Sequence, residues 1–352
     1  PDKPAGAKPP PPPGGAGPQT HGLGPGHPGV RSRSTRHNVG FKVLDRRAEG
    51  RGVSFRATGE MKKLSNNVDH FPDLTNAIRE RFKVTRADGI EFWVNLTLPA
   101  DGREGNDPLP AMWWFYPREY TSQKSLDESK RRTDINSFPR ISTRSMVALT
   151  RLGYAVVEPD CPIMGTEGAL NDVYTSDLRN NLYAVIRALE EKGCVDIDRM
   201  AIGGHSYGAF GTANAMIQTP FFRAGIAGDG NYNRLLTPAG FQSERRELWE
   251  MREIYLRMSP ILWANELQGA LLMYHGMHDQ NTGTAPFHAP KMFHALNVLG
   301  KTAALYMYPY EDHGPATLET NLDMWARWIQ WLDRYVMNYD KYEEAEKEDE
   351  GR

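Results

Sequence analysis

Between residues 82 and 335, short apolar runs alternate with longer amphipathic segments, the pattern of repeated strand–helix units. Runs that are apolar throughout are typical of strands buried on both faces, and regular apolar–polar alternation is typical of an antiparallel pair. Repeated units of this length predict an α/β fold with a mainly parallel central sheet and helices on both faces. The expected strands are residues 82–85, 90–98, 111–116, 154–158, 200–203, 224–227, 270–274 and 303–308.

The helical segments are recognised by apolar residues that recur every three or four positions. In residues 172–192 these fall on one face, and Gly193 follows as a helix-terminating glycine would. Residues 228–267 form a polar, aromatic insertion, and the charged run 340–352 is expected to be a solvated, fraying end. The other expected helices are residues 145–152, 207–218, 290–299 and 317–335.

The pattern predicts four parts along the chain. Residues 1–35 are rich in proline and glycine and cannot bury enough apolar surface to fold, so they are expected to form a disordered arm with polyproline II character. Residues 36–75 contain a predicted hairpin with its turn at Thr58-Gly59. Residues 76–338 carry the strand–helix units, and residues 339–352 form a charged tail.

Composition limits the classes of function. The 352 residues are 39% hydrophobic and 24% charged with a formal net charge of −2, which argues against nucleic acid or an anionic membrane as the main partner. No apolar run approaches the roughly 20 residues that span a bilayer. Two cysteines, Cys161 and Cys194, are too few for a disulfide framework. The compartment is therefore not decided, and the cytoplasm, the periplasm and an organelle all remain possible. Because the chain begins with proline, we expect a processed protein or a fragment.

The clearest chemical motif is Gly204-His-Ser-Tyr-Gly208, a G-x-S-x-G sequence between a predicted strand and a predicted helix. This is the context that a nucleophile elbow requires. The serine is held there in a strained backbone conformation, and side chains two residues to either side would collide with the neighbouring strand and helix. Ser206 is therefore the candidate nucleophile.

A serine nucleophile needs a base, and the base needs an acid that orients it. In this fold both lie on loops after later strands, in the order serine, acid, histidine. His313 follows the last predicted strand and is the candidate base. Asp279 follows the strand 270–274 and is the favoured acid, with Asp229, after the strand that follows the elbow, as the alternative.

Other polar residues near these positions have structural interpretations. Glu311 and Asp312 also compete as the acid, but Asp312 is adjacent to His313 in the sequence, so its side chain would normally point away from that ring. His205, adjacent to the serine, is for the same reason expected to be a packed or hydrogen-bonded neighbour. His275 and His278 suggest a metal pair, but no third ligand lies at helical or hairpin spacing, so neither a metal nor a cofactor is expected.

The tetrahedral oxyanion of acyl transfer needs donors aimed at it. The backbone N–H of Tyr207, the residue after the nucleophile, is one. The second should come from the loop after the strand 111–116, where Pro117 has no N–H to donate. The Tyr116 hydroxyl is therefore the candidate donor, and a half-buried aromatic at a strand end is the alternative interpretation.

A resemblance to a known family rests on three motifs: Gly204-His-Ser-Tyr-Gly-Ala-Phe210, His275-Gly-Met-His-Asp279 and His313-Gly314. Together they resemble the catalytic domain of the prolyl oligopeptidase family of serine peptidases. The insertion from Gly230 to Gln242 is similar to the glutamyl endopeptidase branch of that family. The resemblance covers roughly residues 82–336.

The resemblance implies an α/β-hydrolase fold and a serine peptidase acting on peptides, with nucleophile Ser206, acid Asp279, base His313 and side-chain oxyanion donor Tyr116. It also implies a β-propeller stacked over the active site, which would restrict the size of substrates. The predicted hairpin resembles the end of such a propeller, but the residues before it cannot supply the remaining blades. We expect either a missing segment or the absence of this gate.

Cleavage after glutamate or aspartate would need a cation near the nucleophile, because a desolvated carboxylate must be paired. The insertion after the strand 224–227 is where this fold usually places a substrate pocket. Arg234 is the first candidate, followed by Arg245 and Arg246. Surface or structural ion pairs are the alternative interpretation of the last two.

Two other functions remain open. The same triad on the same fold also serves carboxylesterases and other acyl hydrolases, and a domain can keep the fold while only binding a partner. The insertion favours a peptide substrate over an ester. The presence of a nucleophile, an acid, a base and a donor at usable positions disfavours a role limited to binding.

Overall fold

The computed structural model describes residues 53–55, 61–63, 71–101, 107–129 and 142–350. The chain divides into two compact units, residues 1–67 and 68–352. In the first unit β1 (Val53–Phe55) pairs antiparallel with β2 (Met61–Lys63), as expected for a hairpin. The turn of this hairpin and the arm predicted over residues 1–35 lie outside the described residues.

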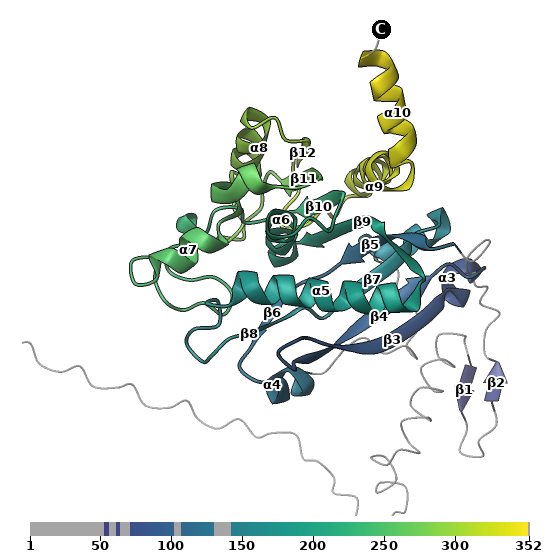
Figure 1. The fold of residues 1–352 in the computed structure, drawn as a ribbon, viewed down its shortest axis with the longest axis horizontal. Helices are drawn as coiled ribbons and strands as arrows, with labels where there is room; N and C mark the ends of the chain where they lie inside the picture. The colour runs from purple at the N-terminus through teal and green to yellow at the C-terminus, as the bar shows by residue number, and fades with distance from the viewer. Residues whose placement is uncertain (1–52, 56–60, 64–70, 102–106, 130–141, 351–352) are drawn as a thin grey trace, which may run out of the picture. The chain divides into compact units, whose positions relative to one another are not determined.

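An eight-stranded sheet organises the second unit (Figure 1), with the strand order β12-β11-β10-β9-β5-β7-β4-β3. The six strands from β12 to β7 run parallel, whereas β4 pairs antiparallel with both β7 and β3. The predicted α/β fold with a mainly parallel sheet is confirmed. The strands are β3 (Ile78–Thr85), β4 (Glu91–Leu98), β5 (Leu109–Trp114), β7 (Ala155–Pro159), β9 (Val195–His205), β10 (Ala224–Gly228), β11 (Ala270–Gly276) and β12 (Ala303–Tyr308).

Helices cover both faces of this sheet (Figure 1). One face packs against α5 (Tyr174–Lys192), α6 (Tyr207–Gln218) and α8 (His288–Val298). The other face packs against η3 (Met146–Leu152), a 3₁₀-helix, and α9 (Leu318–Leu332).

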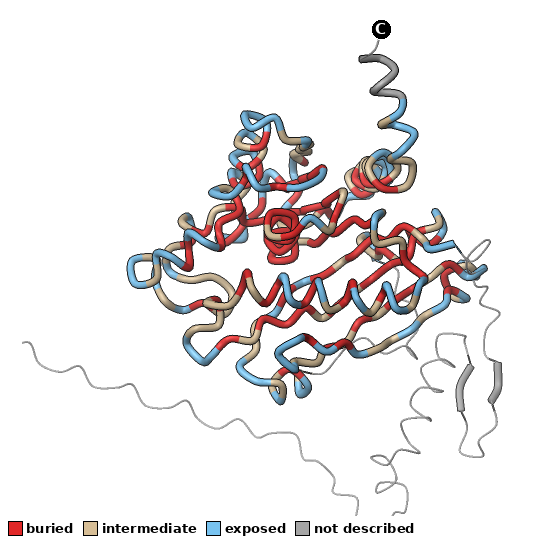
Figure 2. The backbone as a smooth tube through the Cα atoms, in the orientation of Figure 1, coloured by how far each residue is buried: buried red, intermediate tan, exposed pale blue. Residues whose placement is uncertain are grey.

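Neighbouring residues of one strand contribute to the two opposite cores. Trp113 and Val157 belong to the core on the α5 face, whereas Met112 and Val156 belong to the core on the α9 face. Figure 2 shows buried residues along the length of the central strands. Burial on both faces explains why these strands are continuous apolar runs in the sequence.

Shorter elements complete the unit. The strands β6 (Arg118–Tyr120) and β8 (Pro162–Met164) form a small parallel pair. The insertion between β10 and β11 contains η4, α7 and η5, and a π-helical turn, η6, continues α9. The short helices are α3 (Pro72–Asn76), α4 (Gln123–Glu128), η4 (Arg234–Leu236), α7 (Arg252–Met258), η5 (Pro260–Glu266) and η6 (Asp333–Met337).

The charged C-terminal run differs from the expectation of a fraying end, because it forms helix α10 (Tyr339–Glu350). Its glutamate, lysine and alanine residues are strong helix formers. The guanidinium of Arg223 lies 3.6 Å from the centre of the Tyr339 ring, which gives the start of the helix a contact outside itself. Local propensity and this contact outweigh the like-charge repulsion along the run.

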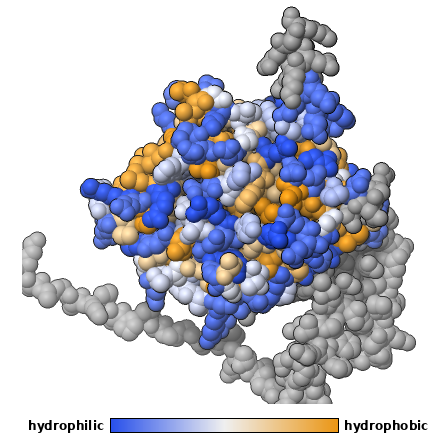
Figure 3. Space-filling view, in the orientation of Figure 1, coloured by the Kyte–Doolittle hydropathy of each residue, from blue (hydrophilic) through white to orange (hydrophobic). Residues whose placement is uncertain are grey.

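The surface in Figure 3 mixes hydrophilic and hydrophobic residues over the face shown. Within the described part of the chain, no helix combines the length and the apolar character needed to cross a lipid bilayer.

Candidate active site

Ser206 lies at the turn between β9 and α6. Its φ of 59° and ψ of −118° are values that residues other than glycine rarely adopt. The turn is held in place because the Ser206 N–H donates to the carbonyl of Gly228, at the end of β10, over 2.8 Å. Strain at a buried serine between a strand and a helix is what a nucleophile elbow requires.

Two glycines permit this turn. A Cβ on Gly204 would lie 2.6 Å from the carbonyl carbon of Gly208, and a Cβ on Gly208 would lie 2.5 Å from the carbonyl oxygen of Phe115. Real Cβ atoms do not approach backbone so closely. The crowding expected from the sequence is therefore present on both sides of Ser206, within the elbow and against the end of β5.

The structure brings three of the candidate residues together at the carboxyl edge of the sheet. His313 follows β12 and Asp279 follows β11. Nε2 of His313 lies 2.9 Å from Ser206 Oγ, and Nδ1 of His313 lies 2.9 Å from Asp279 Oδ2. This is the order of contacts found in a nucleophile–base–acid triad.

Asp279 is buried and accepts several hydrogen bonds. Its Oδ2 accepts from His275 Nε2 at 3.1 Å and from Thr284 Oγ1 at 3.0 Å, and its Oδ1 accepts from the Asn281 N–H at 2.8 Å. Burial alone would raise the pKa of Asp279, but the bonds from His275 and His313 outweigh it and hold the pKa well below its usual range. The carboxylate therefore remains ionised at neutral pH.

The imidazole of His313 experiences opposing effects. Burial lowers its pKa, but the hydrogen bond and the charge of Asp279, followed by the charge of Asp229, raise the pKa above its ordinary value. Arg144 acts in the opposite direction. The net effect favours the protonated ring, which is the form the base adopts after it removes a proton from serine.

The other carboxylates weighed from the sequence have different partners. Oδ2 of Asp229 lies 3.3 Å from His205 Nδ1. Glu311 and Asp312 accept hydrogen bonds from backbone N–H groups. Of these four acids, Asp279 is the one whose carboxylate contacts the ring of the candidate base.

Tyr116 lies directly after β5, and its ring centre is 5.9 Å from that of Tyr207. Its hydroxyl accepts a hydrogen bond from Gln242 Nε2 at 3.2 Å and interacts with the side chain of Ser206. Burial raises the pKa of Tyr116 and outweighs the effect of both partners. The hydroxyl is therefore protonated at neutral pH and can donate a hydrogen bond beside the nucleophile.

Arg234 is the most deeply buried of the three candidate arginines, with 1% of its surface exposed. Its Nη1 donates to Thr237 Oγ1 at 2.9 Å, and its guanidinium lies 4.6 Å from the centre of the Phe241 ring and 5.3 Å from that of Tyr255. Its buried Nε has no hydrogen-bond partner among the described residues, and no described carboxylate forms an ion pair with it. Burial lowers the pKa of Arg234.

The other two arginines lie in different surroundings. Arg246 forms ion pairs with Glu244 at 2.7 Å and with Asp172 at 2.6 Å, which agrees with the structural interpretation of this residue. Arg245 is exposed to solvent. Of the three, Arg234 is the buried cation that forms no ion pair with a described carboxylate, although the charges of Glu244 and Glu119 partly offset the effect of its burial.

Two supporting residues were not assigned from the sequence. His275 donates through Nε2 to Asp279 and to the Thr284 carbonyl, and Thr284 Oγ1 lies 3.1 Å from His313 Nδ1. The His-Gly-x-x-Asp motif contained a signal for His275, because it places this residue at the end of the strand that leads into the loop carrying Asp279. Thr284 had no such signal, since its contact depends on how the loop after β11 folds back.

Buried side-chain atoms of Asp229, His275 and Asp279 that could ligate a metal ion lie within 4.8 Å of one another. His275 is already bonded to Asp279, Asp279 is bonded to His313, and Asp229 contacts His205. His278, the other half of the sequence pair, packs against the Tyr310 ring instead. The cluster is therefore explained by the hydrogen-bond network around His313.

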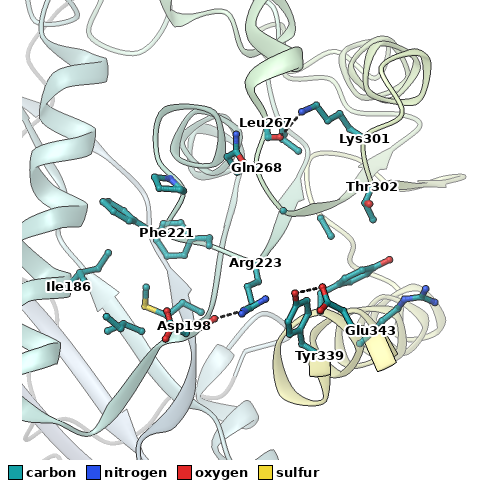
Figure 4. A pocket seen from close by; sticks show the side chains of 18 of the residues that line it. Ile186, Asp198, Phe221, Arg223, Leu267, Gln268, Lys301, Thr302, Tyr339 and Glu343 are labelled. Atoms are coloured by element: carbon teal, nitrogen blue, oxygen red, sulfur yellow. Dashed lines mark hydrogen bonds between the residues drawn. The ribbon is translucent and has the colours of Figure 1, made fainter. Parts of the chain in front are cut away.

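A cavity of about 860 Å³ lies at the opposite, amino-terminal edge of the sheet (Figure 4). Its lining includes Arg223, which donates to the Asp198 carbonyl, and Lys301, which donates to the Leu267 carbonyl at 3.1 Å. Both of these cations are thus already engaged in hydrogen bonds. The candidate reactive groups lie at the other ends of the strands, so this cavity is not their site.

Comparison with known proteins places this geometry in a family. Residues 139–338 match the prolyl oligopeptidase family. The chain is 35% identical over 272 residues to a protein of Oryza sativa subsp. japonica named as a probable chloroplastic glutamyl endopeptidase, and 34% identical over 282 residues to its namesake in Arabidopsis thaliana. These alignments cover 76% and 79% of this chain but 29% of each relative, so the chain spans under a third of their length.

The fold agrees with this placement. Porphyromonas gingivalis dipeptidyl peptidase 4 superposes with a TM-score of 0.62 and 21% sequence identity, over 80% of this chain and 40% of that protein. Such a likeness concerns the fold, which is that of an α/β-hydrolase. The family match extends over more than half of the sequence, including the elbow and the loops that carry Asp279 and His313. The chain belongs to the prolyl oligopeptidase family.

Proposed function

We propose that this chain is a serine peptidase that hydrolyses peptide bonds through an acyl-enzyme, with Ser206 as nucleophile, His313 as base and Asp279 as acid. The observation that carries the proposal is the continuous chain of two 2.9 Å contacts from Asp279 through His313 to Ser206. Membership of the family and the names of the curated relatives support a peptide as the substrate.

Each proton has a defined path in this mechanism. Ser206 Oγ attacks the carbonyl carbon while its proton passes to His313 Nε2, and Asp279 holds Nδ1–H and stabilises the imidazolium. The tetrahedral intermediate collapses when Nε2 returns the proton to the leaving amine. Water then enters, gives a proton to Nε2 and releases the acid from Ser206 by the same steps in reverse order.

The oxyanion of the intermediate is assigned to the Tyr207 N–H and the Tyr116 hydroxyl. Tyr116→Phe is expected to lower kcat by about 100- to 1,000-fold with little change in KM, because the hydroxyl bonds to charge that develops in the transition state. Steady-state kinetics on a peptide substrate measure this split. Tyr183→Phe removes the hydroxyl of an exposed tyrosine on α5 and should leave both constants unchanged. A purely structural role for Tyr116 would be indicated by an unchanged kcat.

We assign the recognition of an acidic residue before the scissile bond to Arg234. It is a buried cation, and the Phe241 ring packs both on its guanidinium, at 4.6 Å, and on the Tyr207 ring, at 5.6 Å. One aromatic side chain therefore separates the cation from the residue next to the nucleophile. A substrate carboxylate would supply the partner that a buried guanidinium needs.

Arg234→Met is expected to reduce kcat/KM for cleavage after Glu by about 10- to 100-fold more than for cleavage after Gln, because one charge-assisted hydrogen bond is lost. A matched pair of peptides that differ at this position measures the ratio. The exposed Arg245→Met is the control and should leave the ratio unchanged. Equal losses on both peptides would refute the assignment.

A short peptide library compared with a simple ester tests the proposed function itself. The proposal predicts cleavage of peptides, with preference for Glu or Asp before the cut. Turnover of the ester with no peptide cleavage would instead favour the acyl hydrolase alternative. We also propose that a β-propeller, as the resemblance implies, restricts access to this site, so that short peptides are the appropriate probe.

A further inference from the structure

A second buried histidine–carboxylate pair lies beside the triad. Asp229 is fully buried, and its Oδ1 accepts a hydrogen bond from the Gly276 N–H at 2.8 Å. Its Oδ2 lies 3.3 Å from His205 Nδ1, and both of these buried atoms lack a hydrogen-bond partner among the described residues. The mechanism above uses neither residue.

The backbone holds this pair in position. Asp229 follows β10 directly and has a φ of 50°, in the left-handed region that residues other than glycine seldom occupy. Its N–H donates to the Tyr274 carbonyl at 2.9 Å, and Gly228 is in register with His205 in the neighbouring strand. A conformation of this kind persists because the surrounding hydrogen bonds determine it.

The pair lies beside the ring of the proposed base. The ring centres of His205 and His313 are 4.8 Å apart, with the rings tilted by 48°. A carboxylate oxygen of Asp229 is within 4.8 Å of one of Asp279. His313 therefore has one carboxylate at its Nδ1 and a second carboxylate nearby, in contact with His205.

A nearby cation, Arg144, opposes the effect of these carboxylates on the pKa of His313. Nη1 of Arg144 is buried and has no hydrogen-bond partner in the described part of the chain, and it lies 2.6 Å from where a Cβ on Gly314 would be. Arg144 lowers the pKa of both His205 and His313. The charged and titratable groups around the base are thus Asp279 after β11, Asp229 after β10, His205 at the end of β9, Arg144 before η3, and Asp312 on its own loop.

The geometry points to His205 and Asp229 as a positioning pair that packs beside the ring of His313 and stabilises its protonated form when it takes the Ser206 proton. Neither residue exchanges a proton in this role. Burial lowers the pKa of His205, so the ring is neutral at neutral pH and the pair carries the single negative charge of Asp229. The inference rests on the proposed function, since it concerns the base of that reaction.

The test measures the rate at which a fluorophosphonate inactivates the full chain as a function of pH. This reagent needs a serine activated by a neutral histidine but no particular peptide sequence. The rate falls as pH decreases through the pKa of His313. Removing a nearby negative charge should lower that pKa, so Asp229→Asn should move the acid limb to lower pH by about 0.5 to 1 unit. Arg144→Met should move it to higher pH.

Several outcomes are distinguishable. Asparagine can keep the bond to Gly276 and tolerates the left-handed conformation, and the thermal unfolding midpoint checks that the variant is folded. Asp196→Asn removes a carboxylate at the far edge of the sheet and should leave the limb unchanged.

If the acid limb of a folded Asp229→Asn stays in place or moves to higher pH, the inference is wrong while the proposed function stands. If Asp229→Asn does not fold, an unshifted limb in Arg144→Met overturns it. A native chain that never reacts with the reagent refutes the proposed function instead.

Discussion

Ser206→Ala is expected to lower kcat for peptide hydrolysis by about 10⁶-fold, which is the scale seen when a triad serine is removed. The variant retains the proposed oxyanion donors and the His313–Asp279 contact but has no atom to form the acyl-enzyme. Any remaining rate would come from water attacking a bound and polarised carbonyl.

Alanine is a well-matched replacement at this position. Serine and alanine both carry a Cβ at the strained φ of 59°, so the backbone of the elbow should be unchanged. We expect the unfolding midpoint to stay close to that of the native chain and KM for a short peptide to change little. Substantial retained hydrolysis by a pure sample of the variant would mean that another residue is the nucleophile.

Asp279→Asn carries the second largest expected effect, a loss of about 10⁴-fold in kcat. The Asp279 Oδ2 accepts hydrogen bonds from His313, His275 and Thr284. An amide that turns its NH₂ group toward these donors leaves His313 in the wrong tautomer and removes the charge that stabilises its protonated form. The ring then cannot accept the serine proton through Nε2.

The controls for this prediction are the competing acids. Asp312→Asn keeps an oxygen for the backbone N–H groups that Asp312 binds and should leave kcat within a few-fold of the native value. Asp229→Asn should have a smaller effect than Asp279→Asn, together with a shifted pH profile. Near-normal kcat in Asp279→Asn, with a severe loss in either of the other two, would reassign the triad acid.

Most of the fold could be predicted because its elements bury apolar residues with a simple period. The strands of the parallel region are continuous apolar runs, and α6 (Tyr207–Gln218) begins and ends where its pattern indicated. The boundary of β9 was less visible. Its first residues alternate between apolar and charged, and its pairing with β5 shifts register between Leu109 and Ala111, so the strand extends beyond its continuous apolar part.

The contacts of the triad followed from topology. In parallel strands the carboxyl ends meet at one edge, so residues on the loops after β9, β11 and β12 had to lie near one another. The sequence could rank Asp279 above Asp229 by loop order but could not exclude either. Both in fact lie beside His313, one at the ring nitrogen and the other through His205.

Other features depend on side chains that meet only after the chain has folded. Arg144 belongs to no motif, and its position near the base depends on how the segment before η3 crosses the loop at Gly314. The burial of Arg234 between Phe241 and Tyr255 likewise depends on how the insertion packs on itself. A hydrophobic pattern carries no information on such contacts between distant loops.

The most direct measurement of the central claim is the mass and position of a fluorophosphonate adduct on the native chain. The account predicts a single adduct on Ser206, formed rapidly at neutral pH and lost in His313→Ala, because the hydroxyl is reactive only beside its base. An adduct on a different residue would contradict the account. So would a folded sample that forms no adduct at any pH.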